Sequence, residues 1–244
     1  MTDYDYTLNP YSGCSFGCTY CYAAFFTRNR ALQDSWGYWV QVKENAVDRL
    51  RRARTPLAGK SIYLSSVTDP YQPVERRLGL VRELLEILAD RGAHVVVQTR
   101  SPWVTRDIDV FRQLERVRVN MTVTTDSEAV RRVFEPHCPT TEKRLDAISE
   151  VAAAGVPTCI TATPLLPLDD VERFADRLVA TRVPRFVVQP FHSAKGRFVA
   201  GTRQAAMDLV ARYRWDDEAY ARAVKHLRVR LPHLDEGRAG FAPH

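Results

Sequence analysis

Short β-type runs alternate with longer helical segments along most of this 244-residue chain. Read from their β-branched and alternating residues, the expected strands are Ser61–Ser65, His94–Thr99, Val117–Thr124, Thr158–Thr163 and Arg185–Gln189. The helical segments before and between them are Val40–Arg54, Arg77–Arg91, Ile108–Arg116, Ser127–Phe134, Thr141–Ala154 and Asp169–Thr181. Because strands that alternate with helices form parallel βα units, we predict an α/β protein with a parallel sheet.

The segment Val117–Thr124 favours a barrel over a doubly wound sheet. Its apolar residues fall on one face and its polar residues, Arg118, Asn120, Thr122 and Thr124, on the other. A parallel strand between two helix layers should be apolar on both faces. One polar face therefore indicates a barrel, full or partial, whose lined interior holds a ligand. A partly exposed sheet of another α/β fold is the alternative.

Polar residues follow the expected strands at the ends where a βα barrel binds ligands. These ends read Ser65-Ser66-Val67-Thr68-Asp69, Thr99-Arg100-Ser101, Thr124-Thr125-Asp126, Thr163-Pro164 and Gln189-Pro190. We expect them to share one mouth, at which each can contact a ligand.

The cysteines are unevenly spread along the chain. Three of the five, Cys14, Cys18 and Cys21, lie within eight residues, whereas Cys138 and Cys159 are isolated. A secreted disulfide framework is usually more even, so this usage is typical of metal binding in a reducing compartment. No run of eighteen apolar residues and no secretory leader is found, so we expect no membrane span and a cytoplasmic protein.

The Cys-x3-Cys-x2-Cys spacing of Cys14, Cys18 and Cys21 predicts three thiolate ligands to one [4Fe–4S] cluster. Gly13 and Gly17 allow the backbone to wrap closely around it. Three ligands leave the fourth iron open to chelate an amino group and a carboxylate. The competing interpretation is structural zinc with His137 or Cys138 as fourth ligand, but structural zinc sites usually have a second cysteine pair, which this sequence lacks.

This motif, with Tyr20 before its last cysteine, resembles the radical S-adenosylmethionine (SAM) superfamily. The strings around it are similar to the spore photoproduct lyase-like branch: Asn9-Pro10-Tyr11-x-Gly13-Cys14, Tyr20-Cys21-Tyr22, Ser65–Glu75, Thr99-Arg100-Ser101, Glu135-Pro136 and Arg144-Leu145.

The resemblance implies a partial (β/α)6 TIM-type barrel, to which we assign residues 1–200. From the helical pattern of the tail, we expect residues 201–244 to form a C-terminal helical extension that closes its open side. The resemblance further implies that SAM lies between the cluster and the strand ends and is cleaved reductively to a 5′-deoxyadenosyl radical. That radical would abstract a hydrogen from a small-molecule or nucleotide-like substrate. An external one-electron reductant of flavodoxin or ferredoxin type would be required.

The resemblance also implies roles for individual residues. Tyr22 would lie along SAM, Thr68 and Thr122 would present hydroxyls, and Arg100 would bind the SAM carboxylate. With the strand-end residues added, the predicted cofactor-binding set is Tyr20, Tyr22, Ser66, Thr68, Asp69, Arg100, Thr122 and Gln189.

One position departs from the lyases. They carry a cysteine at the position of Ser66 that returns a hydrogen atom to the product radical, which serine cannot do because its O–H bond is far stronger than a thiol S–H bond. Cys138, on an expected loop at the mouth, is either a substitute hydrogen donor or an incidental loop cysteine.

The positive net charge of the chain is compatible with a polyanionic partner. A net charge of +6 and a sequence pI near 9.2 allow a polyanion, so lesion repair or modification of nucleic acid is an alternative, although not the favoured one. The loop Phe191–Arg197 is either a substrate contact or an ordinary surface loop. A non-enzymatic iron–sulfur or zinc protein that senses redox state or binds a partner is the other alternative.

Overall fold

The structure is a computed structural model that describes residues 3–191, 203–231, 233–237 and 241–243. Apart from Phe191, the loop Phe191–Arg197 lies outside these residues.

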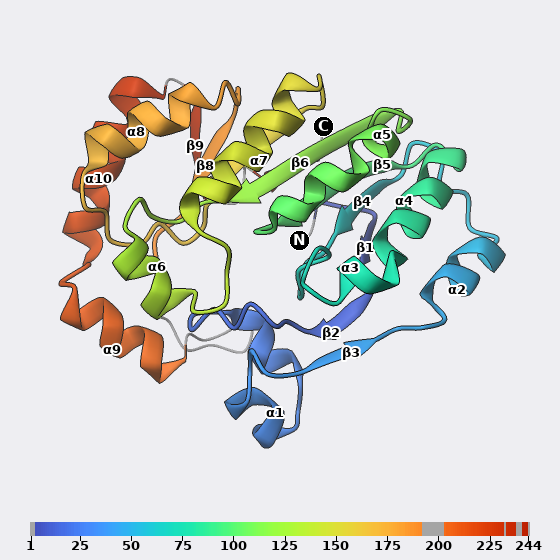
Figure 1. Ribbon diagram of the computed structural model, residues 1–244, viewed down its shortest axis with the longest axis horizontal. Coiled ribbons are helices and arrows are strands. Elements are labelled where there is room, and N and C mark those ends of the chain that lie inside the picture. The colour runs from blue at the N-terminus through green and yellow to red at the C-terminus, as the bar shows by residue number, and fades with distance from the viewer. Residues whose placement is uncertain (1–2, 192–202, 232, 238–240, 244) are drawn as a thin grey trace.

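Seven strands form one parallel sheet, which confirms the predicted α/β class (Figure 1). In sheet order they are β1 (Tyr6–Leu8), β4 (Ser61–Leu64), β5 (His94–Thr99), β6 (Arg116–Thr122), β7 (Thr158–Ala162), β8 (Phe186–Val188) and β9 (Leu234–Glu236). The described part of β1 and that of β9 form the two edges, so the sheet is open between them.

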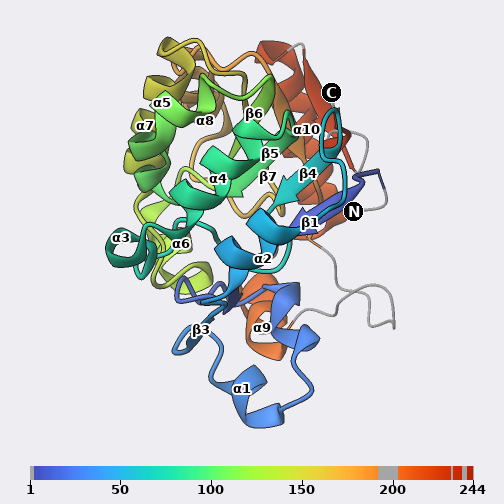
Figure 2. The same ribbon diagram turned by 90° about the vertical axis from the view of Figure 1, so that its right-hand side faces the viewer.

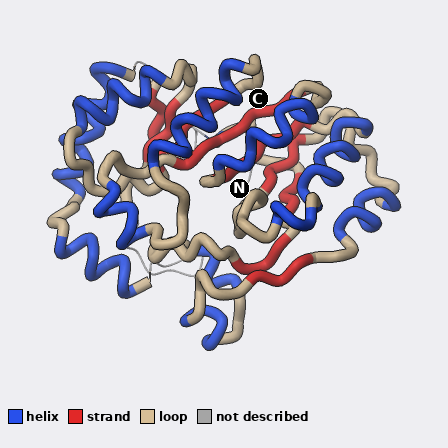
Figure 3. Tube along the Cα trace, in the orientation of Figure 1, coloured by secondary structure: helices blue, strands red, loops and turns tan. Residues whose placement is uncertain are grey.

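Helices connect most of the strands, and several of them pack on the outer side of the sheet, as the tube in Figure 3 shows. They are the 3-10 helices η1 (Tyr22–Phe26) and η2 (Pro102–Asp107), then α1 (Arg30–Asp34), α2 (Ala46–Arg52), α3 (Glu75–Leu78), α4 (Leu80–Asp90), α5 (Ile108–Phe111), α6 (Glu128–Phe134), α7 (Thr141–Ala153), α8 (Val171–Ala180), α9 (Gln204–Arg212) and α10 (Asp217–Arg230). None of those helices combines the length and the apolar character that crossing a bilayer requires.

The predicted helix Val40–Arg54 is wrong in its first part. Val40–Val42 forms β3, which pairs antiparallel with β2 (Tyr11–Gly13), and the helix α2 begins only at Ala46. The alternating Val-Gln-Val suits a strand, and a partner strand was available that local periodicity does not reveal. The predicted helix Arg77–Arg91 is also divided, because Gly79 adopts a left-handed conformation with φ +64°.

The two faces of β6 differ as predicted. Val117, Val119 and Met121 are buried in the main hydrophobic core. On the other face Asn120 and Thr122 are buried as well, and they contact Gln98 of β5: the Asn120 amide donates to Gln98 Oε1 at 3.2 Å, and Gln98 Nε2 donates to Thr122 Oγ1 at 2.7 Å. The polar face therefore lines an interior in which these side chains satisfy one another.

Residues from both ends of the chain meet at one end of this interior, the end at which the strands begin. Arg118 points into it from β6, and its Nη2 donates to the carbonyl of Ala242 at 3.0 Å. Tyr4 donates its hydroxyl proton to the carbonyl of Phe241 at 2.6 Å. The opposite end, where the strands finish, faces β3, α1 and α9 in the lower part of Figure 2.

The segment 201–244 contributes both helices and a strand. Helix α10 packs on α8, and β9 extends the sheet beside β8. The boundary at residue 200 lies outside the described residues, so the division into a barrel and a closing extension stays a prediction.

We predict that Gly13→Ala destabilises the fold by about 2–5 kcal/mol. Gly13 has φ +80°, and an added Cβ would lie 2.5 Å from Cε3 and from the carbonyl oxygen of Trp39. Left-handed strain costs about 1–2 kcal/mol and overpacking adds about 1–3 kcal/mol. Urea unfolding followed by circular dichroism measures the loss.

Gly59→Ala is the matched control. Gly59 also has a positive φ, +70°, but no atom lies within 4 Å of the position that its Cβ would take. This variant should lose only the strain of about 1–2 kcal/mol. Equal losses in the two variants would contradict the packing that the structure shows around Gly13.

Candidate functional site

The loop that carries Cys14, Cys18 and Cys21 connects β2 to η1, and we call residues 13–22 the cluster loop. Cys14 and Cys18 are buried and Cys21 is partly exposed; none of the three is in a disulfide. Two tight turns place them close in space, because Gly17 N donates to the Cys14 carbonyl and Cys21 N donates to the Cys18 carbonyl at 3.1 Å.

Burial affects the thiols of this loop. Desolvation raises the pKa of Cys14 well above the usual thiol value and that of Cys21 to about 11. In the part of the chain that the structure describes, no three His, Cys, Asp or Glu side chains form a ready-made site for a metal ion. The ligand roles of Cys14, Cys18 and Cys21 therefore stay predictions.

The segment after β4 holds the cluster loop. Thr68 donates its hydroxyl proton to the Gly13 carbonyl at 2.5 Å and accepts a hydrogen bond from Gln72 Nε2 at 3.0 Å. The other end of the Gln72 amide accepts a hydrogen bond from Ser15 N at 3.0 Å. Thr68 thus positions the loop, whether or not its hydroxyl also contacts SAM as predicted.

Ser66 lies in the same segment and is held from two sides. Asn9 Oδ1 accepts hydrogen bonds from Ser66 N at 2.9 Å and from Val67 N at 3.0 Å. The Tyr22 hydroxyl donates to the Ser66 carbonyl. The structure therefore brings together Ser66 and Tyr22, two of the predicted cofactor-binding residues.

Asp69 joins the ends of β4 and β5. Its carboxylate is buried and accepts hydrogen bonds from Thr99 Oγ1 at 2.7 Å, from Arg100 N at 2.7 Å and from Tyr71 N at 2.9 Å. Burial raises the pKa of Asp69, although the three hydrogen bonds act in the opposite direction. Asp69 fixes the backbone of Arg100; direct contact of Asp69 with a cofactor stays a prediction.

A buried carboxylate that the predicted site omits, Glu135, joins the cluster loop to the segment after β6 and to α7. Its Oε1 accepts hydrogen bonds from the Tyr20 hydroxyl and from Thr124 Oγ1, the latter at 3.0 Å. Its Oε2 accepts a hydrogen bond from Arg144 Nη2 at 2.6 Å. Burial acts to raise the pKa of Glu135, but Arg144 and Arg100 outweigh it and lower that pKa to about 2.

Two arginines hold the loop between α6 and α7 against the cluster loop. Arg144, itself buried, donates to the carbonyls of Pro139 at 2.8 Å and Thr122 at 3.2 Å. Arg131 donates to the Cys138 carbonyl at 2.9 Å. In the sequence, Glu135 and Arg144 belong to the lyase-like strings. An arginine on the inward face of α7 indicates a buried acidic partner, which is Glu135.

Two buried polar atoms at the mouth, Arg100 Nε and Ser65 Oγ, have no hydrogen-bond partner among the residues that the structure describes. Arg100 donates through Nη2 to the Tyr20 hydroxyl at 3.2 Å, but its Nε lies 3.6 Å from Glu135 Oε1, beyond hydrogen-bond distance. Buried polar groups are normally satisfied. A guanidinium group that contacts Tyr20 of the cluster loop, and whose Nε has no partner among the described residues, fits a carboxylate ligand such as that of SAM.

The other predicted residues lie at different depths. Thr122 belongs to the interior polar layer, where its hydroxyl lies 3.1 Å from that of Thr161. Gln189 is half-buried and its carbonyl accepts a hydrogen bond from Leu165 N at 2.9 Å. Cys138 is buried, with its Sγ 3.6 Å from Cys18 Sγ. The SAM contacts of Thr122 and Gln189, and hydrogen donation by Cys138, stay predictions.

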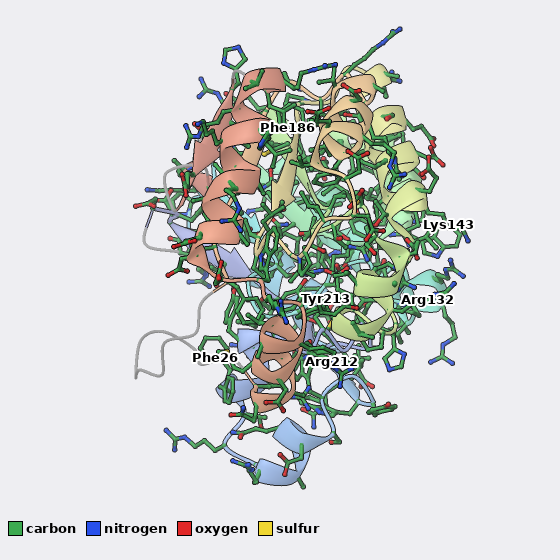
Figure 4. The ribbon with its side chains drawn as sticks, turned by 90° about the vertical axis from the view of Figure 1, so that its left-hand side faces the viewer. Phe26, Arg132, Lys143, Phe186, Arg212 and Tyr213 are labelled. Carbon is green, nitrogen blue, oxygen red and sulfur yellow. The ribbon has the colours of Figure 1, made fainter. Side chains whose placement is uncertain are left out.

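Aromatic side chains cover the cysteines. Phe191, just after β8, packs edge-to-face on Tyr20 and Phe134, with ring centroids 6.3 and 6.4 Å apart. Tyr213, labelled beside α9 in Figure 4, lies 6.0 Å from the ring of Phe134 on α6. Cys14 and Cys18 therefore lie in a second, smaller hydrophobic cluster, and the partly exposed Cys21 packs against it.

We predict that Glu135→Gln destabilises the protein by about 3–5 kcal/mol at neutral pH, because it leaves Arg144 buried and without its counter-charge. The folded-state pKa is lowered from 4.5 to about 2, so the stabilisation is complete above pH 4.5 and is lost as the pH falls towards 2. Urea unfolding over a pH series should show the gap between wild type and variant narrowing below pH 4.5.

Glu142→Gln, on the same helix as Arg144, is the control. Its carboxylate is mostly exposed and pairs with Arg177, so its loss should cost less than about 1 kcal/mol. A gap between wild type and Glu135→Gln that is constant with pH would contradict the assigned ion pair.

Comparisons with known proteins bear on the family to which this chain belongs. The family model "Radical SAM superfamily" matches residues 8–178. An uncharacterised protein of Methanocaldococcus jannaschii is 36% identical over 168 residues, which cover 68% of this chain and 63% of the relative. An uncharacterised protein of Mycobacterium tuberculosis is 29% identical over 224 residues, covering 86% and 66%. The chain thus spans just under two thirds of the length of these relatives.

More distant similarities carry functional names. A radical SAM Nα-GlyT isomerase of Pseudomonas phage M6 is 25% identical over 176 residues, or 70% of this chain and 36% of that protein. A mutant of spore photoproduct lyase superposes with a TM-score of 0.67 at 16% identity, over 96% of this chain and 76% of the lyase. Streptococcus suis SuiB, bound to S-adenosylmethionine, superposes at 0.59 and 12% identity, over 95% and 49%.

The lyase and SuiB comparisons show a shared fold, whereas the family match runs from the last residue of β1 into α8 and includes the cluster loop. The resemblance read from the motifs is thereby confirmed, and this chain belongs to the radical SAM superfamily.

Proposed function

We propose that this protein is a radical SAM enzyme that holds a [4Fe–4S] cluster on Cys14, Cys18 and Cys21 and acts on a small-molecule or nucleotide-like substrate. The observation that carries the proposal is the position of Arg100, which contacts Tyr20 of the cluster loop and whose Nε has no hydrogen-bond partner in the described part of the chain. When bound, the cluster would supply one electron to SAM and so generate the 5′-deoxyadenosyl radical that abstracts a substrate hydrogen.

The chain's own residues would bind and orient SAM. Arg100 suits its carboxylate, since a guanidinium N–H donates a charge-assisted hydrogen bond. Tyr22, the last residue of the cluster loop, is held by its hydrogen bond to the Ser66 carbonyl and would lie along the adenosine part of SAM. Thr122 and Gln189 lie at the ends of β6 and β8, deeper and across the mouth, where they can contact SAM or substrate.

Exclusion of water is the second task of this site. Tyr20, Phe134 and Phe191 cover the thiols and Trp36 is buried in the same cluster. A radical intermediate needs such shielding, because access of solvent and oxidants permits side reactions.

We infer the substrate class from the ligands of the superposed structures and from the polar interior of this chain. Among the superposed structures, spore photoproduct lyase is bound to a dinucleoside photoproduct, and SuiB to a precursor peptide. The polar interior and the net charge of +6 favour a small polar or nucleotide-like substrate for this chain. The unpaired cysteines fit a reducing compartment, the cytoplasm, where a flavodoxin or ferredoxin would act as reductant.

Anaerobic reconstitution tests the proposal. Wild type should bind about four irons per chain and form 5′-deoxyadenosine from SAM when dithionite is added. Replacing Cys14, Cys18 or Cys21 by alanine should abolish both properties, because each removes one of three thiolate ligands. Liquid chromatography measures 5′-deoxyadenosine and a colorimetric assay measures iron.

Cys159→Ala is the control, since Cys159 is buried on β7 and belongs to the main sheet rather than to the cluster loop. It should retain iron and SAM cleavage. A colourless, zinc-loaded wild type without SAM cleavage would instead support the non-enzymatic alternative and refute the proposal.

A further inference from the structure

Cys138 contacts one of the three predicted cluster ligands, although it lies 120 residues away in sequence. Its Sγ is 3.6 Å from Cys18 Sγ, and both side chains are buried, 7% and 4% exposed. Phe16, Phe134 and Leu166 belong to the same hydrophobic cluster. The two sulfur atoms therefore meet in a desolvated environment, where a weak hydrogen bond has no competition from water.

The direction of this hydrogen bond follows from the ligand role of Cys18. A thiolate bound to iron carries no proton and can only accept, so Cys138 must be the donor. The other acceptor within reach of the Cys138 thiol is the Phe16 carbonyl, which is more distant at 3.9 Å. Both contacts are with the cluster loop, which places the thiol beside the cluster.

The backbone, rather than the thiol, holds Cys138 in place. Its amide donates to the Glu135 carbonyl at 3.1 Å, and its own carbonyl accepts a hydrogen bond from Arg131 at 2.9 Å. A change confined to the side chain therefore leaves these supports intact, which makes the thiol's effect measurable.

We propose that Cys138 is a positioning residue for the cluster: its S–H donates a hydrogen bond to the ligating sulfur of Cys18 and makes the cluster easier to reduce. This inference rests on the proposed function. Reduction adds one negative charge to the cluster, and a donor to one of its sulfur atoms stabilises the reduced form more than the oxidised form. The residue thus acts through Cys18 and not on the substrate.

The test compares Cys138→Ala, Cys138→Ser and the control Cys159→Ala, each loaded with its cluster. A redox titration monitored by electron paramagnetic resonance (EPR) gives the midpoint potential, and an iron assay gives the occupancy. Cys138→Ala should keep full iron but reduce with an equilibrium constant about tenfold smaller, which for one electron is a downward shift of about 59 mV. Cys138→Ser keeps a donor and should restore most of the shift, and Cys159→Ala should match wild type.

Two results would overturn the inference. A midpoint potential of Cys138→Ala equal to that of wild type would show that the thiol does not act on the cluster. Loss of iron in Cys138→Ala would show that Cys138 is a ligand and not a hydrogen-bond donor.

The cluster-free chain supplies an independent readout. Diamide takes two electrons and two protons from a pair of neighbouring thiols and leaves a disulfide, so brief treatment should crosslink Cys18 to Cys138 in preference to Cys14 or Cys21. Peptide mass spectrometry detects the product, and its absence would contradict the observed contact. A wild type that crosslinks in this way but never holds a cluster would refute the proposed function, whereas a loaded protein with unchanged potentials refutes this inference alone.

Discussion

Glu135 and Arg144 form an ion pair that is almost completely shielded from solvent, with Oε2 and Nη2 2.6 Å apart. Neither charge can be left alone in this environment, because an unpaired buried charge costs several kcal/mol. The remaining hydrogen bonds of the two groups reach Tyr20 in the cluster loop, Thr122 at the end of β6 and Pro139 in the loop before α7. One ion pair thus holds three separate segments in a fixed relation, and it reaches the cluster loop at Tyr20, between Cys18 and Cys21.

The sequence strings that resemble the lyases form hydrogen bonds with one another. Asn9 holds Ser66 and Val67, Gly13 accepts a hydrogen bond from Thr68, and Tyr11 donates to Glu75 at 2.5 Å. These residues come from the segments before and after β4, which are more than 50 residues apart. These hydrogen bonds hold the cysteine-rich loop against the segment that follows β4, and such preorganisation is what a functional site requires.

Local sequence pattern predicted the elements that have strong local signals. The strand His94–Thr99 is found with the same bounds, and α7 begins at Thr141 because Thr140 accepts a hydrogen bond from Lys143 N as an N-cap. The three-residue strands β1 and β9 were missed, since so short a run has no measurable period. The contacts of Glu135 with Tyr20 and of Cys138 with Cys18 were also missed, because they join distant segments and no spacing rule describes them. The three cysteines could be found from spacing alone, but their neighbours could not.

Ligation by the three thiolates of Cys14, Cys18 and Cys21 would leave one iron of a [4Fe–4S] cluster open for SAM. EPR spectroscopy of the reduced, reconstituted protein, recorded with and without SAM, tests it most directly, because a ligand on that iron changes the spectrum of the whole cluster. We expect a reduced-cluster signal whose g values shift when SAM is added, and no shift when Arg100 is replaced by methionine at the same SAM concentration. A cluster signal of the wild type that is identical with and without saturating SAM would contradict the account.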